Sequence, residues 1–451
     1  MPAIERRRGG SLFQWSPGKS ESWLPGPGST ATAWTAILRD AGESFSTMHR
    51  STGRQNLQCQ SGKKGTRGKT VLVASDWAPI RAFAAIIQRD PESVYGDMLP
   101  VLRAADLRVV NCECALTASR KPVWKSGSVF KGMPEHAKGL TAVPFEVACL
   151  ANNHVFDYGI SGFRESLDTL RRHGITTVGA GLTEEEACGP LTLVFDKAKI
   201  SIINISEGED LTASRGGPGV CGWDLPRTMS LIRQLKKNGS CVIVIGHCGL
   251  EYIPYPPPYV AAAFRAMAAA GADCVIGHHP HVPQGIEWYQ GRPIAYSLGN
   301  FVFYQHTDLY YRRVGFCITL RVSGGAVSAI ELHPYHITER GLRRLSAYED
   351  EKFRRKISQI SRPLESPAGT EKAWQAYLAY YGMSGFAEEV HGILKKMKSE
   401  PQKGAAMFRN RITTLQHHEL WRDLLTRFVA GKARPYSREA YRVVEEWFSR
   451  V

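Results

Sequence analysis

The sequence lacks any stretch that approaches the roughly 20 consecutive apolar residues of a membrane-spanning helix. Its longest alanine-rich run, YVAAAFRAMAAAGADCVIG, is interrupted by Arg265 and predicts a helix that runs into a strand. The basic N-terminus, MPAIERRRGGSLFQWSPGK, is not followed by an apolar segment, which argues against a secretory signal. These absences predict a cytoplasmic protein with no transmembrane segment, and they leave association with the cell envelope open.

The ten cysteines include no CxxC pairs with the spacing of a structural zinc site. Cys149, Cys241, Cys274 and Cys317 lie inside apolar segments, where a reduced cysteine behaves as a small hydrophobic residue. We therefore expect a chain whose cysteines are reduced.

The net charge of +15 comes from the two ends of the chain. Residues 70–340 carry 25 basic and 25 acidic side chains, whereas residues 1–69 have a net charge of +7 and residues 341–451 of +8. Two basic ends could bind nucleic acid or an anionic surface, but dispersed surface charge explains them better. No motif interleaves aromatic and basic residues, which argues against a nucleic-acid partner.

The composition divides the chain into three parts. Residues 1–69 are rich in Gly, Ser, Thr, Arg and Lys and predict a disordered basic tail. In residues 70–340, β-branched strands such as KTVLVASDW alternate with helical patterns such as FRESLDTLRRHG, which is typical of an α/β domain. The strands from about 290 to 335 follow one another without helices and predict an antiparallel edge. Residues 341–451 show helical spacing and predict a helical C-terminal extension.

Side chains that can bind metal recur at the C-terminal ends of the predicted strands. Ligands bind beyond these ends in open α/β sheets, and carboxylate, amide and imidazole together favour Mn, Fe or Zn over a dedicated calcium site. Each residue alone has a structural explanation, such as a helix cap or a buried histidine, but GHHPH places three histidines in four positions. The set is Asp76, Asn111, Glu113, Asn153, His154, His247, His278, His279 and His281.

Four longer motifs resemble the CapA family of capsule and poly-γ-glutamate biosynthesis proteins, in the calcineurin-like metallophosphoesterase superfamily. They are VFKGMPEH, ANNHVFDYG, HCGLEYIPYPPPY and GADCVIGHHPHVPQGIEWYQGRPIAYSLGNFVF, in order within about residues 70–335. The resemblance implies a four-layer αββα metallophosphoesterase-like sandwich in residues 70–340. It also implies one or two divalent metal ions (Mn, Fe or Zn), an anionic polymer or phosphate ester as substrate, and capsule-synthesis machinery as a partner.

The resemblance further implies a role for each matched residue. His154 would act near the leaving group as a catalytic residue, while Asn152 would hold the turn. Apart from the resemblance, Lys131 is a candidate contact for the substrate anion or a solvated surface lysine, and Glu251 is a candidate to contact the substrate or to orient His247. The implied metal ligands are Asp76, Glu113 in a bridging position, Asn153, His247, His279 and His281.

Two residues depart from the family pattern. Ser75 stands where the family usually has glycine, and Ala78 stands where the wider superfamily has a metal-binding histidine. The first metal site is therefore expected to be poor in ligands unless His278 or Glu251 compensates.

Two functions remain open on these grounds. The ligand set at the strand ends favours a metal-dependent hydrolase or transferase that acts on a phosphate ester, with His154 donating a proton. The missing histidine at position 78 and the basic ends favour a non-catalytic assembly or polymer-binding component on the same scaffold.

Overall fold

The computed structural model describes residues 68–195, 198–208, 212–213, 217–431 and 435–449. The predicted basic tail lies almost entirely outside the described residues, since β1 begins at Lys69. Among the described residues, no helix is both long enough and apolar enough to cross a membrane.

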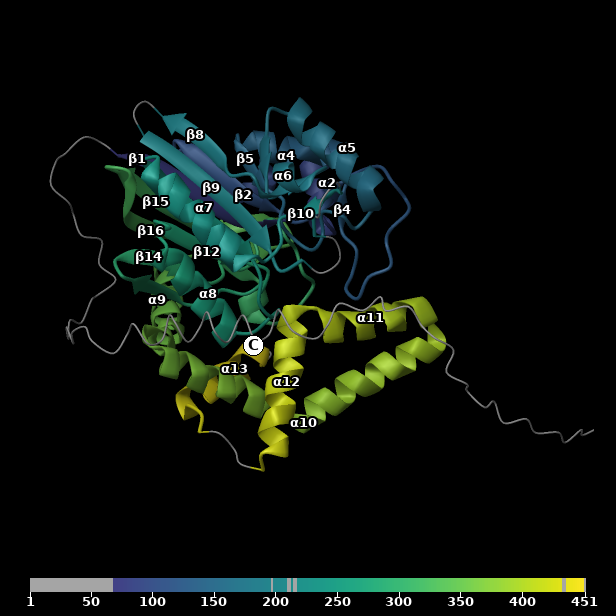
Figure 1. The fold of residues 1–451 in the computed structure, drawn as a ribbon. Helices are drawn as coiled ribbons and strands as arrows, with labels where there is room; N and C mark the ends of the chain where they lie inside the picture. The colour runs from purple at the N-terminus through teal and green to yellow at the C-terminus, as the bar shows by residue number, and fades with distance from the viewer. Residues whose placement is uncertain (1–67, 196–197, 209–211, 214–216, 432–434, 450–451) are drawn as a thin grey trace, which may run out of the picture. The chain divides into compact units, whose positions relative to one another are not determined.

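Two large sheets form the centre of the described structure (Figure 1). The first has the strand order β17-β16-β15-β1-β2-β5-β6, and the second has the order β13-β14-β12-β11-β9-β8. β1, β2, β5 and β6 run parallel, as do β9, β11, β12 and β14. β15, β16 and β17 add an antiparallel edge to the first sheet. The predicted α/β class and its late antiparallel edge are both confirmed.

The described elements have the following bounds. The strands of the first sheet are β1 (Lys69–Trp77), β2 (Leu107–Cys112), β5 (Val147–Cys149), β6 (Thr176–Val178), β15 (Val314–Ser323), β16 (Ala326–Thr338) and β17 (Gly341–Arg344). Those of the second are β8 (Leu191–Phe195), β9 (Ala198–Ser206), β11 (Ser240–His247), β12 (Cys274–His278), β13 (Ile286–Tyr289) and β14 (Arg292–Ala295). Two small sheets pair β3 (Ala115–Leu116) with β4 (Lys131–Gly132), and β7 (Ala180–Gly181) with β10 (Gly219–Val220).

The α-helices are α2 (Ala82–Arg89), α3 (Leu99–Arg103), α4 (Ala137–Ala142), α5 (Gly159–Arg172), α6 (Glu184–Cys188), α7 (Leu225–Lys237), α8 (Pro258–Ala269), α9 (Ala347–Ser361), α10 (Pro367–Ser399), α11 (Pro401–Thr413), α12 (Leu415–Val429) and α13 (Arg438–Phe448). Short 3-10 helices cover Ser93–Met98, Pro134–His136, Tyr310–Arg312 and Arg362–Glu365. α5 matches the helix predicted from FRESLDTLRRHG.

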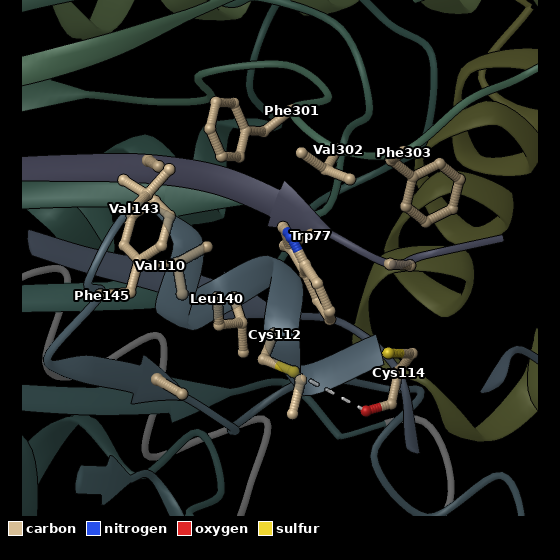
Figure 2. Packing of buried hydrophobic residues seen from close by; sticks show 14 of the residues in the cluster. Trp77, Val110, Cys112, Cys114, Leu140, Val143, Phe145, Phe301, Val302 and Phe303 are labelled. Atoms are coloured by element: carbon tan, nitrogen blue, oxygen red, sulfur yellow. Dashed lines mark hydrogen bonds between the residues drawn. The ribbon is translucent and has the colours of Figure 1, made fainter. Parts of the chain in front are cut away.

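The two sheets face each other across one apolar core. Val71 and Val73 of β1 lie in this core with Ile243 of β11, whereas Leu72 and Ala74 belong to a second core on the outer face of the first sheet. Strands buried on both faces read as nearly continuous apolar runs, which is why KTVLVASDW shows little alternation. Figure 2 shows part of the second core around Trp77.

Helices complete the layers on both sides of the paired sheets. Phe83 of α2, Leu140 of α4 and Phe163 of α5 pack into the core on the outer face of the first sheet. On the other side, α7 contacts β11 and α8 contacts β12. The resulting order is helix, sheet, sheet, helix, which is the four-layer arrangement that the resemblance implied.

The C-terminal helices share the core between the sheets. Phe353 of α9, Ala373 of α10 and Trp447 of α13 belong to it, and the helices lie together beside the sheets (Figure 1). The long helix α10 has a break at Gly382, whose φ of 58° suits a residue without a Cβ. The division of the chain after residue 340 stays a prediction.

The expectation that the cysteines are reduced is wrong for one pair. Cys188, at the end of α6, forms a disulfide with Cys221, which follows β10. The two cysteines lie 33 residues apart, and the bond ties α6 to the small β7–β10 sheet. The pairing depends on the folded chain and cannot be recognised from a CxxC motif in the sequence. Cys149, Cys241, Cys274 and Cys317 are buried and unbonded, as predicted.

We predict that reduction of this disulfide destabilises the protein by about 2–4 kcal/mol, because the crosslink restricts the unfolded chain. Dithiothreitol should therefore lower the thermal midpoint of the wild type, and Cys188→Ser should show the lower midpoint without reductant. Peptide mapping under non-reducing conditions checks the pairing directly. Equal midpoints with and without dithiothreitol would contradict the prediction.

Candidate metal centre

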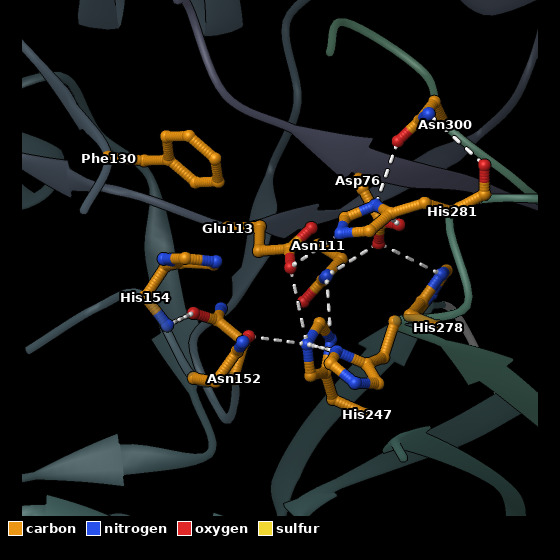
Figure 3. A network of polar contacts seen from close by, with 12 residues as sticks. Asp76, Asn111, Glu113, Phe130, Asn152, His154, His247, His278, His281 and Asn300 are labelled. Carbon is orange, nitrogen blue, oxygen red and sulfur yellow. Dashed lines mark hydrogen bonds and ion pairs between the residues drawn. The ribbon is translucent and has the colours of Figure 1, made fainter. Parts of the chain in front are cut away.

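The strand ends of both sheets bring the predicted metal-binding residues together (Figure 3). In the first sheet the strand register pairs Asp76 of β1 with Asn111 of β2. In the second sheet His247, the last residue of β11, pairs with His278, the last residue of β12. The segments that follow β2, β5 and β12 supply the other members, which are Glu113, Asn153, His154, His279 and His281.

What we call the first ligand group consists of Glu113, His247 and His279. Each offers one atom that lies within 4.8 Å of the others. His247 Nε2 lies 3.3 Å from Glu113 Oε1 and 3.2 Å from His279 Nδ1. Asn153 Oδ1 lies 2.9 Å from the same His247 nitrogen. Four side chains thus direct potential ligand atoms to one position, as a metal site requires.

Asp76, Glu113 and His281 make up the second ligand group, again with their ligand atoms within 4.8 Å of one another. His281 Nε2 lies 3.7 Å from Glu113 Oε1, and His281 Nδ1 lies 3.4 Å from Asp76 Oδ2. Glu113 belongs to both groups. A carboxylate shared by two neighbouring groups has the position of a bridging ligand, the role that the resemblance implied for Glu113.

The unsatisfied polar atoms of this region fit a bound cation. Among the described residues, neither carboxylate oxygen of Glu113 has a hydrogen-bond partner, nor does Asn111 Oδ1, although Glu113 is fully buried and Asn111 is only 1% exposed. Buried polar groups are nearly always hydrogen-bonded, so each such atom requires an explanation. A divalent cation between the ligand groups would neutralise the Glu113 carboxylate, and carboxylate with imidazole suits Mn, Fe or Zn.

The pKa values of the two carboxyl groups are pushed apart. Burial raises the pKa of Glu113 well above its usual value, and the neighbouring charge of Asp76 raises it further. Burial would also raise the pKa of Asp76, but its hydrogen bond to His281 and the charges of His278 and His281 lower that pKa overall. Two carboxylates this close repel each other unless a cation lies between them.

His247 is held in the neutral form that binds metals. Burial lowers the pKa of His247 well below its usual value, and the nearby rings of His279, His278 and His281 lower it further. Its Nδ1 lies 3.2 Å from the side-chain amide of Asn111, on the side away from the first ligand group.

The backbone of the GHHPH loop adopts an unusual conformation at the two histidines that belong to the ligand groups. His279 has a φ of 99° and His281 a φ of 56°. Positive φ costs a non-glycine residue of the order of 1–3 kcal/mol and is concentrated at functional sites. The strain turns two histidines that are two residues apart toward different ligand groups.

Asn300 fixes the orientation of His281. Its Oδ1 lies 2.9 Å from His281 Nδ1, and its Nδ2 donates to the carbonyl oxygen of His281 at 3.2 Å. With Nδ1 bonded to the Asn300 amide oxygen, the lone pair of His281 lies on Nε2, which faces Glu113. These contacts give Asn300 a structural role beside the second ligand group.

His154 belongs to a buried hydrogen-bonded chain beside the ligand groups. His154 Nδ1 lies 2.6 Å from Asp157 Oδ2, and Lys125 Nζ donates to Asp157 Oδ1 at 3.0 Å. The ring of Phe130 packs against His154 with 4.4 Å between centroids. Asp157 thereby holds the proton on Nδ1 and leaves Nε2 for exchange with a reacting group. Asn152 Oδ1 accepts from the backbone N–H of His154 at 3.1 Å, which closes the turn as predicted.

Comparison with known proteins identifies the family. Residues 66–305 match the family described as bacterial capsule synthesis protein PGA_cap, which is more than half of the chain. The chain belongs to this capsule synthesis protein family. Its CapA resemblance, drawn from four motifs, is confirmed.

Relatives within the capsule synthesis family carry related names. The PGA biosynthesis protein CapA of Bacillus subtilis (strain 168) is 33% identical over 225 residues, which are 48% of this chain and 58% of that one. The capsule biosynthesis protein CapA of Bacillus anthracis is 33% identical over 38% of this chain and 43% of that one. A protein of Mycobacterium tuberculosis (strain H37Rv) named as a probable polyglutamine synthesis accessory protein is 30% identical over 59% and 76%. The match thus spans about half the length of the two CapA proteins.

Solved structures resemble the chain more distantly. A hypothetical protein from Thermus thermophilus matches 60% of this chain and all of its own, at 14% identity and a TM-score of 0.37. The sulfate thiohydrolase SoxB from the same organism matches 59% of this chain and 46% of its own, at 9% identity and a TM-score of 0.35.

The two predicted substrate contacts belong to neither ligand group. Lys131 Nζ donates to the carbonyl oxygen of Ser119 and lies 4.9 Å from the centre of the Tyr158 ring, so protein groups already engage this ammonium. Glu251 is exposed, and the contact to His247 Nδ1 comes from Asn111. The roles of Lys131 and Glu251 in binding substrate stay predictions.

The metal site that was expected to be poor in ligands, because Ala78 replaces a histidine, corresponds to the second ligand group. Ala78 is fully buried and offers no ligand atom there. His278 does not replace the missing histidine, because its Nδ1 faces the Ser75 hydroxyl at 3.1 Å and Asp76 Oδ1 at 3.7 Å. His278 therefore positions Asp76, while the second group keeps three residues.

We predict that Asn300→Ala weakens metal binding by about 10- to 100-fold, since partners that orient a ligating histidine typically contribute that much affinity. Titration of Mn²⁺ or Zn²⁺ against a competing chelator measures the effect. Asn238→Ala serves as the matched control, because Asn238 is exposed at the C-terminal end of α7. Unchanged affinity in Asn300→Ala would show that His281 needs no such support.

Proposed function

We propose that this protein is a metal-dependent hydrolase or transferase that acts on a phosphate ester or a related bond in capsule or poly-γ-glutamate production. The observation that carries the proposal is the fully buried Glu113, shared by two ligand groups and lacking hydrogen bonds to both carboxylate oxygens. The family supplies the pathway, since its relatives are named for capsule and polyglutamate synthesis.

The residues that would hold two ions divide as follows. Glu113, His247, His279 and Asn153 would hold one ion, and Asp76, Glu113 and His281 would hold the other. Ions bound there supply Lewis acidity, which polarises a phosphoryl oxygen and lowers the pKa of water. The first set has one donor more, so it should bind its ion more tightly.

His154 would supply the proton for the departing oxygen. Asp157 accepts a hydrogen bond from Nδ1 of His154 and stabilises the ring when both nitrogens are protonated. Lys125 holds the Asp157 carboxylate in place from the other side.

Two aromatic side chains cover this part of the site. Phe130 covers one face of His154, and Phe303 packs on Phe130 at 5.3 Å and on His281 at 4.7 Å between ring centroids. These aromatic rings keep water away from His154 and His281.

Purified wild-type protein should contain Mn, Fe or Zn, and His279→Ala should lose metal because the first ligand group then has one imidazole fewer. Elemental analysis by mass spectrometry measures the content. His306→Ala is the matched control, because the His306 side chain is 87% exposed. Wild-type protein without metal and without activity on bis(p-nitrophenyl) phosphate would refute the proposed function.

His154→Ala should lower kcat on bis(p-nitrophenyl) phosphate by about 100-fold or more, the usual contribution of a positioned acid or base. Its metal content should equal that of the wild type, because His154 is in neither ligand group. Asp157→Asn should lower kcat by a smaller factor. If His154→Ala loses metal as well as activity, the residue acts through the ligand groups and the assigned role is wrong.

A non-catalytic assembly component is the second candidate, favoured by the three-residue second ligand group beside the buried Ala78. In a strain that depends on this gene for polymer, His154→Ala should then leave polymer production intact. Loss of polymer in His154→Ala, with normal protein and metal levels, favours the enzyme. Deleting residues 341–451 is a poor test, since it would remove Phe353 and Trp447 from the shared core.

A further inference from the structure

Arg312 is a cation close to the second ligand group. The residue is partly buried, yet among the described residues it forms no ion pair, and none of its side-chain N–H donors has a hydrogen-bond partner. Guanidinium groups taken partly out of water normally pair with a carboxylate. Within the described part of the chain, the guanidinium group of Arg312 thus uses none of its N–H donors.

Contacts to Tyr252 fix the position of this cation. The guanidinium carbon of Arg312 lies 3.6 Å from the centre of the Tyr252 ring, a close cation–π contact. The same ring stacks on His281 with 5.9 Å between centroids and 29° between planes. A stacked guanidinium keeps its N–H groups at its edge, where they remain available to an acceptor.

Tyr252 is itself held from both ends. Its backbone N–H donates to the carbonyl oxygen of Pro280, between the two ligating histidines, at 2.7 Å. Its hydroxyl accepts from Gln305 Nε2 at 3.3 Å. With a φ of 67°, Tyr252 shares the strained backbone of His279 and His281. The stacking surface under Arg312 is therefore built into the same loops as the ligand groups.

Asn300 ties the backbone of Arg312 to the second ligand group. Its Nδ2 donates to the carbonyl oxygens of both His281 and Arg312, each at 3.2 Å. One buried amide thus sets the distance between a ligating histidine and the cation. Burial lowers the pKa of Arg312, and the nearby Tyr252 and Glu251 raise that pKa only in part.

We propose that Arg312, stacked on Tyr252, binds an oxyanion of the substrate, a carboxylate or a phosphate, next to the group that reacts at the ligand groups. Planar oxyanions match the forked N–H donors of arginine, which bind two oxygens at once. The inference rests on the proposed function, because it names a second recognition element of the same site. It also assigns the substrate at least one negative group besides the reacting one.

Calorimetric titration of the metal-loaded protein tests the proposal with two probes, inorganic phosphate and γ-linked triglutamate. Arg312→Ala should weaken binding of at least one probe about tenfold or more, and the probe that loses affinity identifies phosphate or carboxylate as the source of the oxyanion. Arg312→Lys should bind more weakly than the wild type but better than Arg312→Ala, since it keeps the charge without the fork. Arg340→Ala, an exposed arginine, is the matched control and should bind as the wild type does.

Equal binding of both probes by Arg312→Ala and wild type would overturn the proposal, as would wild-type protein that binds neither probe. An equal loss in Arg340→Ala would overturn it too, because general surface charge would then explain the effect. Metal content and hydrolysis of bis(p-nitrophenyl) phosphate are measured on the same samples. If the wild type contains metal and is active but Arg312→Ala binds both probes equally well, this inference alone is refuted. If the wild type contains no metal but its affinity for a probe depends on Arg312, the proposed function alone is refuted.

Discussion

The buried carboxylate of Glu113 is the constraint on which the rest of the centre depends. A carboxylate that is fully removed from water and accepts no hydrogen bond would be costly in the folded protein unless positive charge lies close to it. His247 and His281 approach one of its oxygens from opposite ligand groups, at 3.3 Å and 3.7 Å. Burial lowers the pKa of His247 well below its usual value, whereas Glu113 and Asp76 raise the pKa of His281 to about 10 despite its burial. A cation bound between the ligand groups would add to the positive charge that His281 supplies to Glu113.

The packing of the fold holds the strand ends around Glu113 in place. The core between the sheets places β1 and β11 so that Asp76 and His247 end within reach of the same carboxylate. The C-terminal helices support the loops from outside. Leu250 and Ile253, which follow β11, pack against Trp374 of α10 and Leu424 of α12.

The segment that carries Lys125 is supported in the same way. Lys403 of α11 donates to the carbonyl oxygens of Lys125 and Gly127, at 2.9 Å and 2.6 Å. Lys125 in turn holds Asp157, the partner of His154. The helices beyond the matched family region thus reach the centre through two separate contacts.

Sequence alone predicted the strand ends and the residues at them, because parallel strands bring their C-terminal ends to one edge whatever the loops do. On that basis we expected the residues that the structure brings together, which are Asp76, Glu113, His247, His279 and His281.

Arg312 was not expected, since YYRRVG has no pattern that separates it from Arg313. Its position depends on Tyr252, 60 residues away, and on an amide from Asn300. The Cys188–Cys221 bond escaped prediction for the same reason, because its partners meet only through the β7–β10 pairing.

The two departures from the family pattern act on one strand end and should be considered together. Ser75 donates to the carbonyl oxygen of Gly299, so its remaining contact, to His278 Nδ1, must be accepted from an N–H. That bond holds the His278 ring beside Asp76 Oδ1, which also accepts from Asn111 Nδ2 at 2.8 Å. Asp76 is therefore oriented by two neighbours on one oxygen, leaving Oδ2 toward His281. Ser75 thus helps to fix the orientation of Asp76, one of the three residues of the second ligand group.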